Sequence, residues 1–183
     1  MQKADKSRVG GMIYTKKKVR KLAKKALNAF DFSDRGYSGC YYSRIKDKIG
    51  CKVFHNGYDT KKELLDSYSW EAATKEYNMI KRLEYSNMTP KAYSVEAFRL
   101  GKEWWAVIIM EHIVGPTLHY FDKQGDCAIE YIFNKFRRIT GYDYFDDHQN
   151  NVVVHINDKY PTGYKYYVID LDPRRMTKVG KRK

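Results

Sequence analysis

Three polar side chains near the carboxyl end of the sequence could hold a hard metal ion beside a phosphate group. Asp146 and Asn151 lie five positions apart, and Asp170 follows a turn-rich stretch. Runs of β-branched and aromatic residues at 152–154 and 166–169 flank that stretch and predict a β-hairpin. The hairpin would return Asp170 to the neighbourhood of Asp146 and Asn151. Carboxylate and amide oxygens in one place favour Mg²⁺ over zinc or iron.

The same pattern also suits a polar hairpin whose Asp and Asn residues only shape turns. It resembles, however, the protein kinase-like superfamily, in which a D-x-x-x-x-N catalytic loop runs into a strand, a hairpin and a D-F-G element. Asp146 to Asn151 has the first spacing, and Asp170-Leu171-Asp172 stands where D-F-G would. The resemblance implies that Asp146 accepts the proton of a substrate hydroxyl and that Asn151 and Asp170 hold Mg²⁺.

A lysine and a glutamate upstream resemble the nucleotide-binding pair of that family. Lys52, in C-K-V-F, is flanked by apolar residues like the strand lysine that contacts the α- and β-phosphates of ATP. Apolar spacing predicts a helix over 67–83. On it Glu76 resembles the glutamate that holds the lysine, and Glu71 is the rival candidate.

A glycine-bearing turn precedes the predicted lysine strand. Gly36 and Gly39 match the second and third glycines of G-x-G-x-x-G-x-V, Asp34 replaces the first, and Tyr41 stands at the valine. The resemblance assigns Gly36, Ser38 and Gly39 to nucleotide binding, since glycine lets backbone N–H groups approach phosphate oxygens. An ordinary hairpin turn explains the same residues.

The segment I-I-M-E-H-I-V-G-P-T-L resembles the hinge of kinase-like proteins. By that resemblance Met110 is the gatekeeper, and the backbone groups of Glu111 and Ile113 meet the adenine edge of ATP. A buried strand ended by a Gly-Pro turn would look the same. His148 occupies the position of a histidine in the aminoglycoside and choline kinase-like branches, where it would assist the γ-phosphate or make a structural hydrogen bond.

Three departures from the family pattern shape the prediction. Tyr144-Phe145 replace the usual His-Arg or His-Gly, and Asp172 replaces the glycine of D-F-G. Only 13 residues follow Asp170, so we expect the activation segment and later helices to be missing. The chain therefore resembles the miniature kinases of secreted bacterial effectors and phages. That resemblance implies a protein substrate phosphorylated on Ser or Thr, an activating host protein, and a location in the cytoplasm, or the host cytoplasm for an effector.

The expected fold is α+β, a truncated protein kinase-like fold with an antiparallel-sheet N-lobe, one long helix, a hinge and a minimal C-lobe. Apolar spacing predicts strands at 41–45, 49–54, 92–98 and 104–110, and helices beginning at Thr15 and spanning 126–140. The predicted domains are a basic extension with an amphipathic helix (1–30), the N-lobe and hinge (31–113), the minimal C-lobe (114–173) and a basic tail (174–183).

Charge and cysteine content narrow the alternatives. The formal charge of +13 is concentrated at the ends: residues 1–25 carry +9, residues 174–183 carry +6, and 26–173 carry about −2. Such ends either solubilise the chain or bind an acidic or nucleic-acid partner. Three scattered cysteines indicate reduced thiols, and no apolar run reaches transmembrane length. The alternative function is a pseudokinase or nucleotide-dependent binding module that uses these ends.

Overall fold

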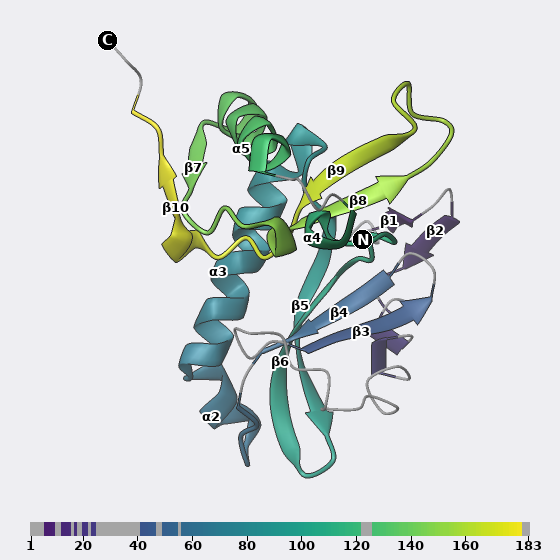
Figure 1. Ribbon diagram of the computed structural model, residues 1–183. Helices are drawn as coiled ribbons and strands as arrows, with labels where there is room; N and C mark the ends of the chain where they lie inside the picture. Colours follow the sequence, from purple (N-terminus) through teal and green to yellow (C-terminus); the bar gives the residue numbers. More distant parts are fainter. Residues whose placement is uncertain are drawn as a thin grey trace. The chain divides into compact units, whose positions relative to one another are not determined.

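The computed structural model describes residues 6–9, 12–15, 17, 20–21, 23–24, 41–46, 49–54, 56–121 and 126–180 (Figure 1). The chain divides into two compact units, each described by itself below. Unit 1 consists of residues 1–77 and 91–112, and unit 2 of residues 78–90 and 113–183. Small antiparallel sheets and a few helices give an α+β architecture, the class that the sequence predicts. None of the described helices is long and apolar enough to span a bilayer.

Unit 1 is built on a four-stranded antiparallel sheet with the strand order β3-β4-β6-β5. The strands are β3 (Tyr41–Lys46), β4 (Ile49–Val53), β5 (Ala92–Leu100) and β6 (Glu103–Glu111). All four were predicted from their β-branched and aromatic runs. Strand β6 is internal, and its residues 106–110 are buried, as expected for a continuous apolar strand.

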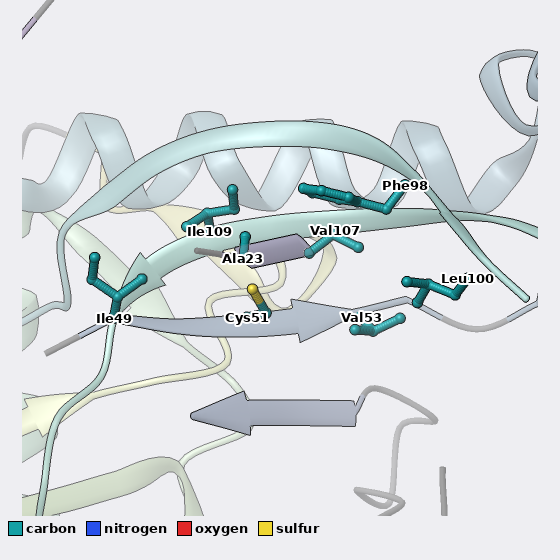
Figure 2. Packing of buried hydrophobic residues seen from close by; sticks show 8 residues of the cluster. All are labelled: Ala23, Ile49, Cys51, Val53, Phe98, Leu100, Val107 and Ile109. Carbon is teal, nitrogen blue, oxygen red and sulfur yellow. The ribbon is translucent and has the colours of Figure 1, made fainter. Parts of the chain in front are cut away.

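Side chains along β4 alternate between the two faces of the sheet, so the apolar core of unit 1 and the side chain of Lys52 lie on opposite faces. Ile49, Cys51 and Val53 have side chains on one face of the sheet, so Lys52 points to the opposite face. The core on the first face also receives Ala23, one of the helical residues between 17 and 24. Ala23 of the predicted basic helix therefore packs on its own unit. Figure 2 shows the buried cluster: Ala23, Ile49, Cys51, Val53, Phe98, Leu100, Val107 and Ile109.

The thiol of Cys51 is enclosed by this core, with 1% of the residue exposed. Burial raises the pKa of Cys51 to about 12, because the charged thiolate loses its hydration there. A raised pKa leaves the thiol protonated at every pH below that value. We expect iodoacetamide to leave Cys51 unmodified at pH 8–10 in a variant with Cys40 and Cys127 replaced by serine. Rapid alkylation of the native protein, without denaturant, would contradict the packing of β4.

Three elements of unit 1 were not predicted from the sequence. Within the segment described above only as a basic extension, β1 (Lys6–Val9) and β2 (Met12–Thr15) pair as a hairpin. The intervening Gly-Gly dipeptide is a recognised hairpin signal. A short helix, α2 (Lys61–Leu65), was also missed. Its N-terminus is a capping box in which Thr60 Oγ1 accepts from Glu63 N and Glu63 Oε2 accepts from Thr60 N.

Helix α3 (Tyr68–Leu83) agrees with the helix predicted over 67–83. It begins in unit 1 and ends in unit 2, because the boundary falls after Tyr77. Ser67 starts it by accepting a hydrogen bond from Trp70 N through its hydroxyl. The chain returns to unit 1 after Pro90, and its third crossing falls after His112, one residue before the predicted end of the N-lobe and hinge.

Unit 2 contains helices and two small antiparallel sheets. Strand β8 (Val152–Ile156) pairs with β9 (Tyr164–Val168), which is the hairpin predicted around the catalytic-loop pattern. Helix α5 (Asp126–Thr140) has the predicted bounds and ends at Gly141, whose φ of 72° suits the left-handed conformation that glycine adopts without strain. The remaining elements are η1 (Glu84–Ser86), α4 (Leu118–Phe121), η2 (Gln149–Asn151), β7 (Tyr142–Tyr144), η3 (Pro173–Arg175) and β10 (Met176–Lys178).

Residues that were assigned to the basic tail are part of unit 2. Strand β10 pairs with β7 in the register Met176↔Tyr144. The helical turn η3 precedes it, and Asp172 caps that turn by accepting a hydrogen bond from Arg174 N. The tail assignment rested on charge alone, whereas Pro173 and the cap residue Asp172 favour a defined turn.

Candidate active site

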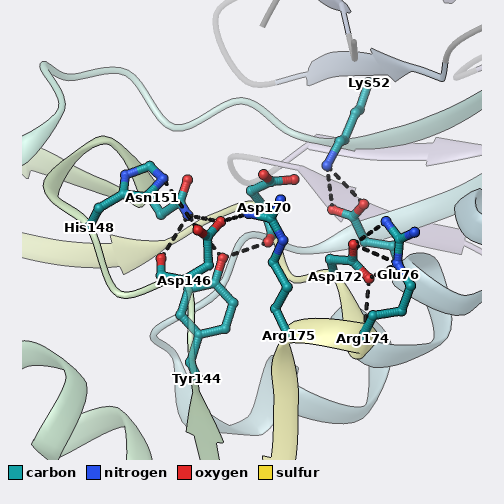
Figure 3. A network of polar contacts seen from close by, with 10 residues as sticks. All are labelled: Lys52, Glu76, Tyr144, Asp146, His148, Asn151, Asp170, Asp172, Arg174 and Arg175. Atoms are coloured by element: carbon teal, nitrogen blue, oxygen red, sulfur yellow. Dashed lines mark hydrogen bonds and ion pairs between the residues drawn. The ribbon is translucent and has the colours of Figure 1, made fainter. Parts of the chain in front are cut away.

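The ammonium group of Lys52 is bound by the carboxylate of Glu76. Lys52 Nζ lies 2.8 Å from both Glu76 Oε1 and Glu76 Oε2 (Figure 3). The residues are 1% and 3% exposed, respectively. Helix α3 carries Glu76 and β4 carries Lys52, so both residues belong to unit 1. The rival Glu71 instead pairs with Lys75 on the surface, and the predicted Lys52–Glu76 pair is present.

A buried ion pair of this kind stabilises a fold poorly, because its desolvation cost offsets the attraction between the charges. Removing two charges from water costs several kcal/mol for each, and apolar residues of similar volume often stabilise a protein at least as well. Lys52 Nζ also lies 5.3 Å from the centroid of the Phe54 ring, an arrangement that favours the charged amine. A buried pair is therefore weak evidence for a purely stabilising role at this position.

At the predicted hinge, the backbone N–H of Glu111 at the end of β6 is already hydrogen-bonded. Met110 is 7% exposed, and Glu111 N donates to Lys91 O at 2.7 Å. Lys91 N in turn donates to Glu111 Oε2 at 3.2 Å. Any backbone contact of Glu111 with adenine would therefore use its carbonyl oxygen. Ile113, the other hinge residue predicted, is half-buried and belongs to unit 2.

The predicted glycine loop falls in a segment that the structure leaves undescribed. Gly36, Ser38 and Gly39 lie between the described helical residues and β3. Their assignment to phosphate binding stays a prediction.

The predicted catalytic loop forms a hydrogen-bonded cluster within unit 2. Asn151 is 5% exposed, and its Nδ2 lies 2.9 Å from both the backbone oxygen and the Oδ2 of Asp146 (Figure 3). The 3₁₀ turn η2 ends at Asn151, and β8 begins at the next residue. The side-chain amide of Asn151 thus joins the two ends of the six-residue loop from Asp146 to Asn151.

Tyr144 ties this loop to Asp170. Its hydroxyl donates to the backbone oxygen of Asp170 at 2.8 Å and accepts from Asn151 Nδ2 at 3.0 Å. Its ring stacks on Phe133 of α5, with centroids 5.4 Å apart. Sequence comparison with the family marked Tyr144 only as a departure, but the tyrosine joins the two predicted metal ligands.

The backbone at Asp170 is held in an uncommon conformation. Its φ is 58°, in the left-handed region that residues other than glycine rarely adopt. The preceding residue is fixed by the hydrogen bond from Ile169 N to Asn151 O, 2.8 Å long. Such conformations cost about 1–3 kcal/mol and cluster at functional sites, because the surroundings must enforce them.

The donors present at Asn151 and Asp170 fit Mg²⁺. Because Asn151 Nδ2 faces hydrogen-bond acceptors, Asn151 Oδ1 remains for a cation, and the Asp170 residue is half-buried. Within the described part of the chain, no three His, Cys, Asp or Glu side chains gather as a metal site. Mg²⁺ does not need such a cage, because it keeps several waters and commonly takes one or two carboxylates together with substrate phosphates.

His148 donates a backbone hydrogen bond from its N to the backbone oxygen of Asp146 at 2.9 Å, but its imidazole makes no hydrogen bond to the Asp146 carboxylate. His148 Nε2 is 3.7 Å from Asp146 Oδ1, beyond hydrogen-bonding distance, and its side chain is 53% exposed. The imidazole is therefore open to solvent next to Asp146, and its predicted role stays a prediction.

Arg175 is a contact of the catalytic loop that sequence reasoning missed. Its guanidinium forms an ion pair with Asp146 Oδ2, and its backbone oxygen accepts from Phe145 N at 2.7 Å. The neighbouring Arg174 instead pairs with Asp172. Asp146 Oδ2 thus meets both Arg175 and Asn151, whereas Asp146 Oδ1 lies 3.7 Å from His148 Nε2.

Replacing Arg175 should therefore impair the orientation of Asp146. On the kinase-like prediction, kcat for phosphoryl transfer should fall by about tenfold or more in Arg175→Ala, with the Kd for ATP unchanged, since orientation of a catalytic group affects the chemical step. Arg174→Ala is the matched control and should retain kcat. Equal losses in the two variants, or a rise in kcat for Arg175→Ala, would refute this orienting role.

Two comparisons of the sequence with known proteins found no match. No protein-family model matches the chain, and no curated protein has a significantly similar sequence.

Proposed function

We propose that the protein is a kinase-like phosphotransferase of minimal size that moves the γ-phosphoryl group of ATP to a Ser or Thr hydroxyl of a protein substrate, with Mg²⁺ as its metal. The proposed fold is the truncated protein kinase-like fold, with unit 1 in the role of the N-lobe. A partner protein that raises activity belongs to the same proposal, by resemblance to effector and phage kinases.

The observation that carries the proposal is the enclosed pair of Lys52 and Glu76. Its two partners come from a sheet strand and a helix 24 positions apart, and both are almost fully buried. A purely structural pair is the competing explanation. A lysine held by a carboxylate beneath a sheet is, however, the arrangement that orients the α- and β-phosphates of ATP in kinases. In this role Lys52 binds the nucleotide, and Glu76 fixes the amine.

The cluster in unit 2 supplies the groups for the transfer itself. In the proposed reaction, a substrate hydroxyl donates a hydrogen bond to Asp146 Oδ1. Its oxygen bonds to the γ-phosphorus while the bond from that phosphorus to the β–γ bridging oxygen breaks. ADP leaves with the bond electrons, and the hydroxyl proton passes to Asp146. Asn151 and Asp170 would hold Mg²⁺, which supplies positive charge against the phosphate oxygens.

One observation favours a second candidate, a pseudokinase that binds a nucleotide without transferring phosphate. Arg175 already engages the carboxylate of Asp146, and a guanidinium held there could block a substrate hydroxyl. Under this candidate the chain binds ATP, and Asp146 serves only to hold the loop. The two candidates agree on Lys52 and differ on Asp146.

Phosphoryl transfer from γ-labelled ATP separates these possibilities. The full-length chain is incubated with Mg²⁺ and ATP, alone, with a generic basic protein substrate, and with host-cell extract as a source of an activating partner. Labelled phosphoserine or phosphothreonine supports the proposal. ATP binding without transfer under all three conditions supports the pseudokinase, and absence of ATP binding contradicts both candidates.

A further inference from the structure

A second charged region lies in unit 1, away from Lys52 in the sequence and on different elements. A cavity of about 400 Å³ opens between the described helical residues among 17–24 and the β5–β6 hairpin. Its volume lies within the range of about 300–1,000 Å³ that is typical of ligand sites. We call it the basic groove, because five cationic side chains line it: Lys17, Arg20, Lys21, Lys24 and Arg99.

Most of this positive charge is uncompensated. Arg20 has a carboxylate partner, Glu96 Oε2, at 3.5 Å, and its guanidinium lies 5.9 Å from the Phe98 ring centroid. The other four cations of the groove form no ion pair within the described part of the chain. A concave surface that carries four unpaired cations concentrates a positive potential and attracts an anion.

The cations are arranged in a row along the groove and do not converge on a single point. Lys17, Lys21 and Lys24 follow the i, i+4, i+7 spacing of one helix face. At 1.5 Å per residue the row is about 10 Å long. Arg99 contributes from β5, an edge strand of the sheet. An extended polyanion uses such a row, whereas a single phosphate or carboxylate contacts only one end of it.

The aromatic side chain of Trp104 also lines the basic groove. Trp104 of β6 is half-buried and lines the cavity, and Lys61 Nζ lies 5.9 Å from its ring centroid. Proteins that bind single-stranded nucleic acid combine a basic groove for the backbone with aromatic side chains on which bases stack. A bilayer surface is flat and would not enter the recess, so the shape favours a strand.

We propose that the basic groove binds single-stranded nucleic acid, with its phosphates on the four unpaired cations and a base against Trp104. The inference is independent of the proposed phosphotransferase function, because no residue of the groove belongs to the candidate active site.

The test measures binding of a fluorescein-labelled oligothymidylate to the full-length chain by fluorescence anisotropy over a series of salt concentrations. The groove variant combines Lys17→Gln, Lys21→Gln and Lys24→Gln. The control variant removes the same number of charges at exposed lysines outside the groove, by Lys62→Gln, Lys102→Gln and Lys159→Gln. A backbone-matched abasic oligonucleotide, a duplex of equal length and phosphatidylserine-containing vesicles serve as competitors.

We expect the plot of log affinity against log salt to become less steep by about 2 in the groove variant, since each phosphate contact on a single strand contributes ~0.7. The control variant should keep most of the slope, and the abasic strand should compete about fivefold more weakly or worse, because the stacked base contributes ~1–3 kcal/mol. Equal losses in the two variants, no binding, or equal competition by abasic strand, duplex or vesicles would overturn the proposal.

Discussion

Asp146→Asn is expected to lower phosphoryl transfer by about 10²–10⁴-fold, the usual contribution of a positioned general base. The amide that replaces the carboxylate has nearly the same shape and can still accept from Asn151. It cannot take the hydroxyl proton or attract the guanidinium of Arg175. ATP binding should persist, because the nucleotide is assigned to Lys52, Asn151 and Asp170. Transfer of γ-labelled phosphate and nucleotide affinity are measured on the same preparation.

Asp147→Asn provides the matched control for that loss. Asp147 is exposed and directly adjacent, and its side chain forms neither a hydrogen bond nor an ion pair within the described residues. We expect Asp147→Asn to retain transfer within about twofold, as most surface substitutions do. Retained activity in Asp146→Asn, at a temperature where it is folded, would remove Asp146 from the reaction and favour the pseudokinase candidate.

Lys52→Met is expected to destabilise the protein by about 3–5 kcal/mol, because it leaves the carboxylate of Glu76 buried without its partner. The effect concerns the fold and does not depend on any activity. Urea unfolding monitored by circular dichroism measures the change. Lys75→Met is the control, since Lys75 pairs with Glu71 where both side chains are more than half exposed. Its loss should cost less than about 1 kcal/mol.

The double variant Lys52→Met/Glu76→Leu separates stability from function. Replacing both members of a buried ion pair by apolar residues is often neutral or stabilising. We expect the double variant to regain most of the stability lost in Lys52→Met while it fails to bind ATP. A folded double variant that binds ATP as tightly as the natural sequence would assign Lys52 a structural role only.

The sequence predicted the parts of the candidate site that lie on strongly periodic elements. Lys52 follows from a β-branched strand, Glu76 from the spacing of apolar residues on α3, and the Asp146–Asn151 loop from its place before a hairpin. Period-2 and period-3.6 patterns fix which face a residue occupies. The Lys52–Glu76 pair was predictable for this reason, although the preference over Glu71 needed the family resemblance.

Tyr144 and Arg175 could not be predicted because their contacts depend on pairing between distant segments. Strand β10 lies against β7 in the register Met176↔Tyr144, and this pairing brings Arg175 to Asp146. Three-residue strands carry too little alternation to reveal their partners. The charge pattern led to the opposite prediction, because it assigned Arg175 to a basic tail outside the minimal C-lobe. The missed helix α2 is a different case, since Thr60 and Glu63 display a capping-box spacing in the sequence.

A crystal structure of the full-length chain with Mn²⁺ and a non-hydrolysable ATP analogue tests the central claim most directly. The account predicts one nucleotide whose α- or β-phosphate accepts a hydrogen bond from Lys52 Nζ. It also predicts an anomalous Mn²⁺ peak ligated by Asp170 and Asn151, at roughly the 2.0–2.2 Å typical of such small divalent ions. A nucleotide that contacts neither Lys52 nor Asp170, or a metal bound elsewhere, would contradict it.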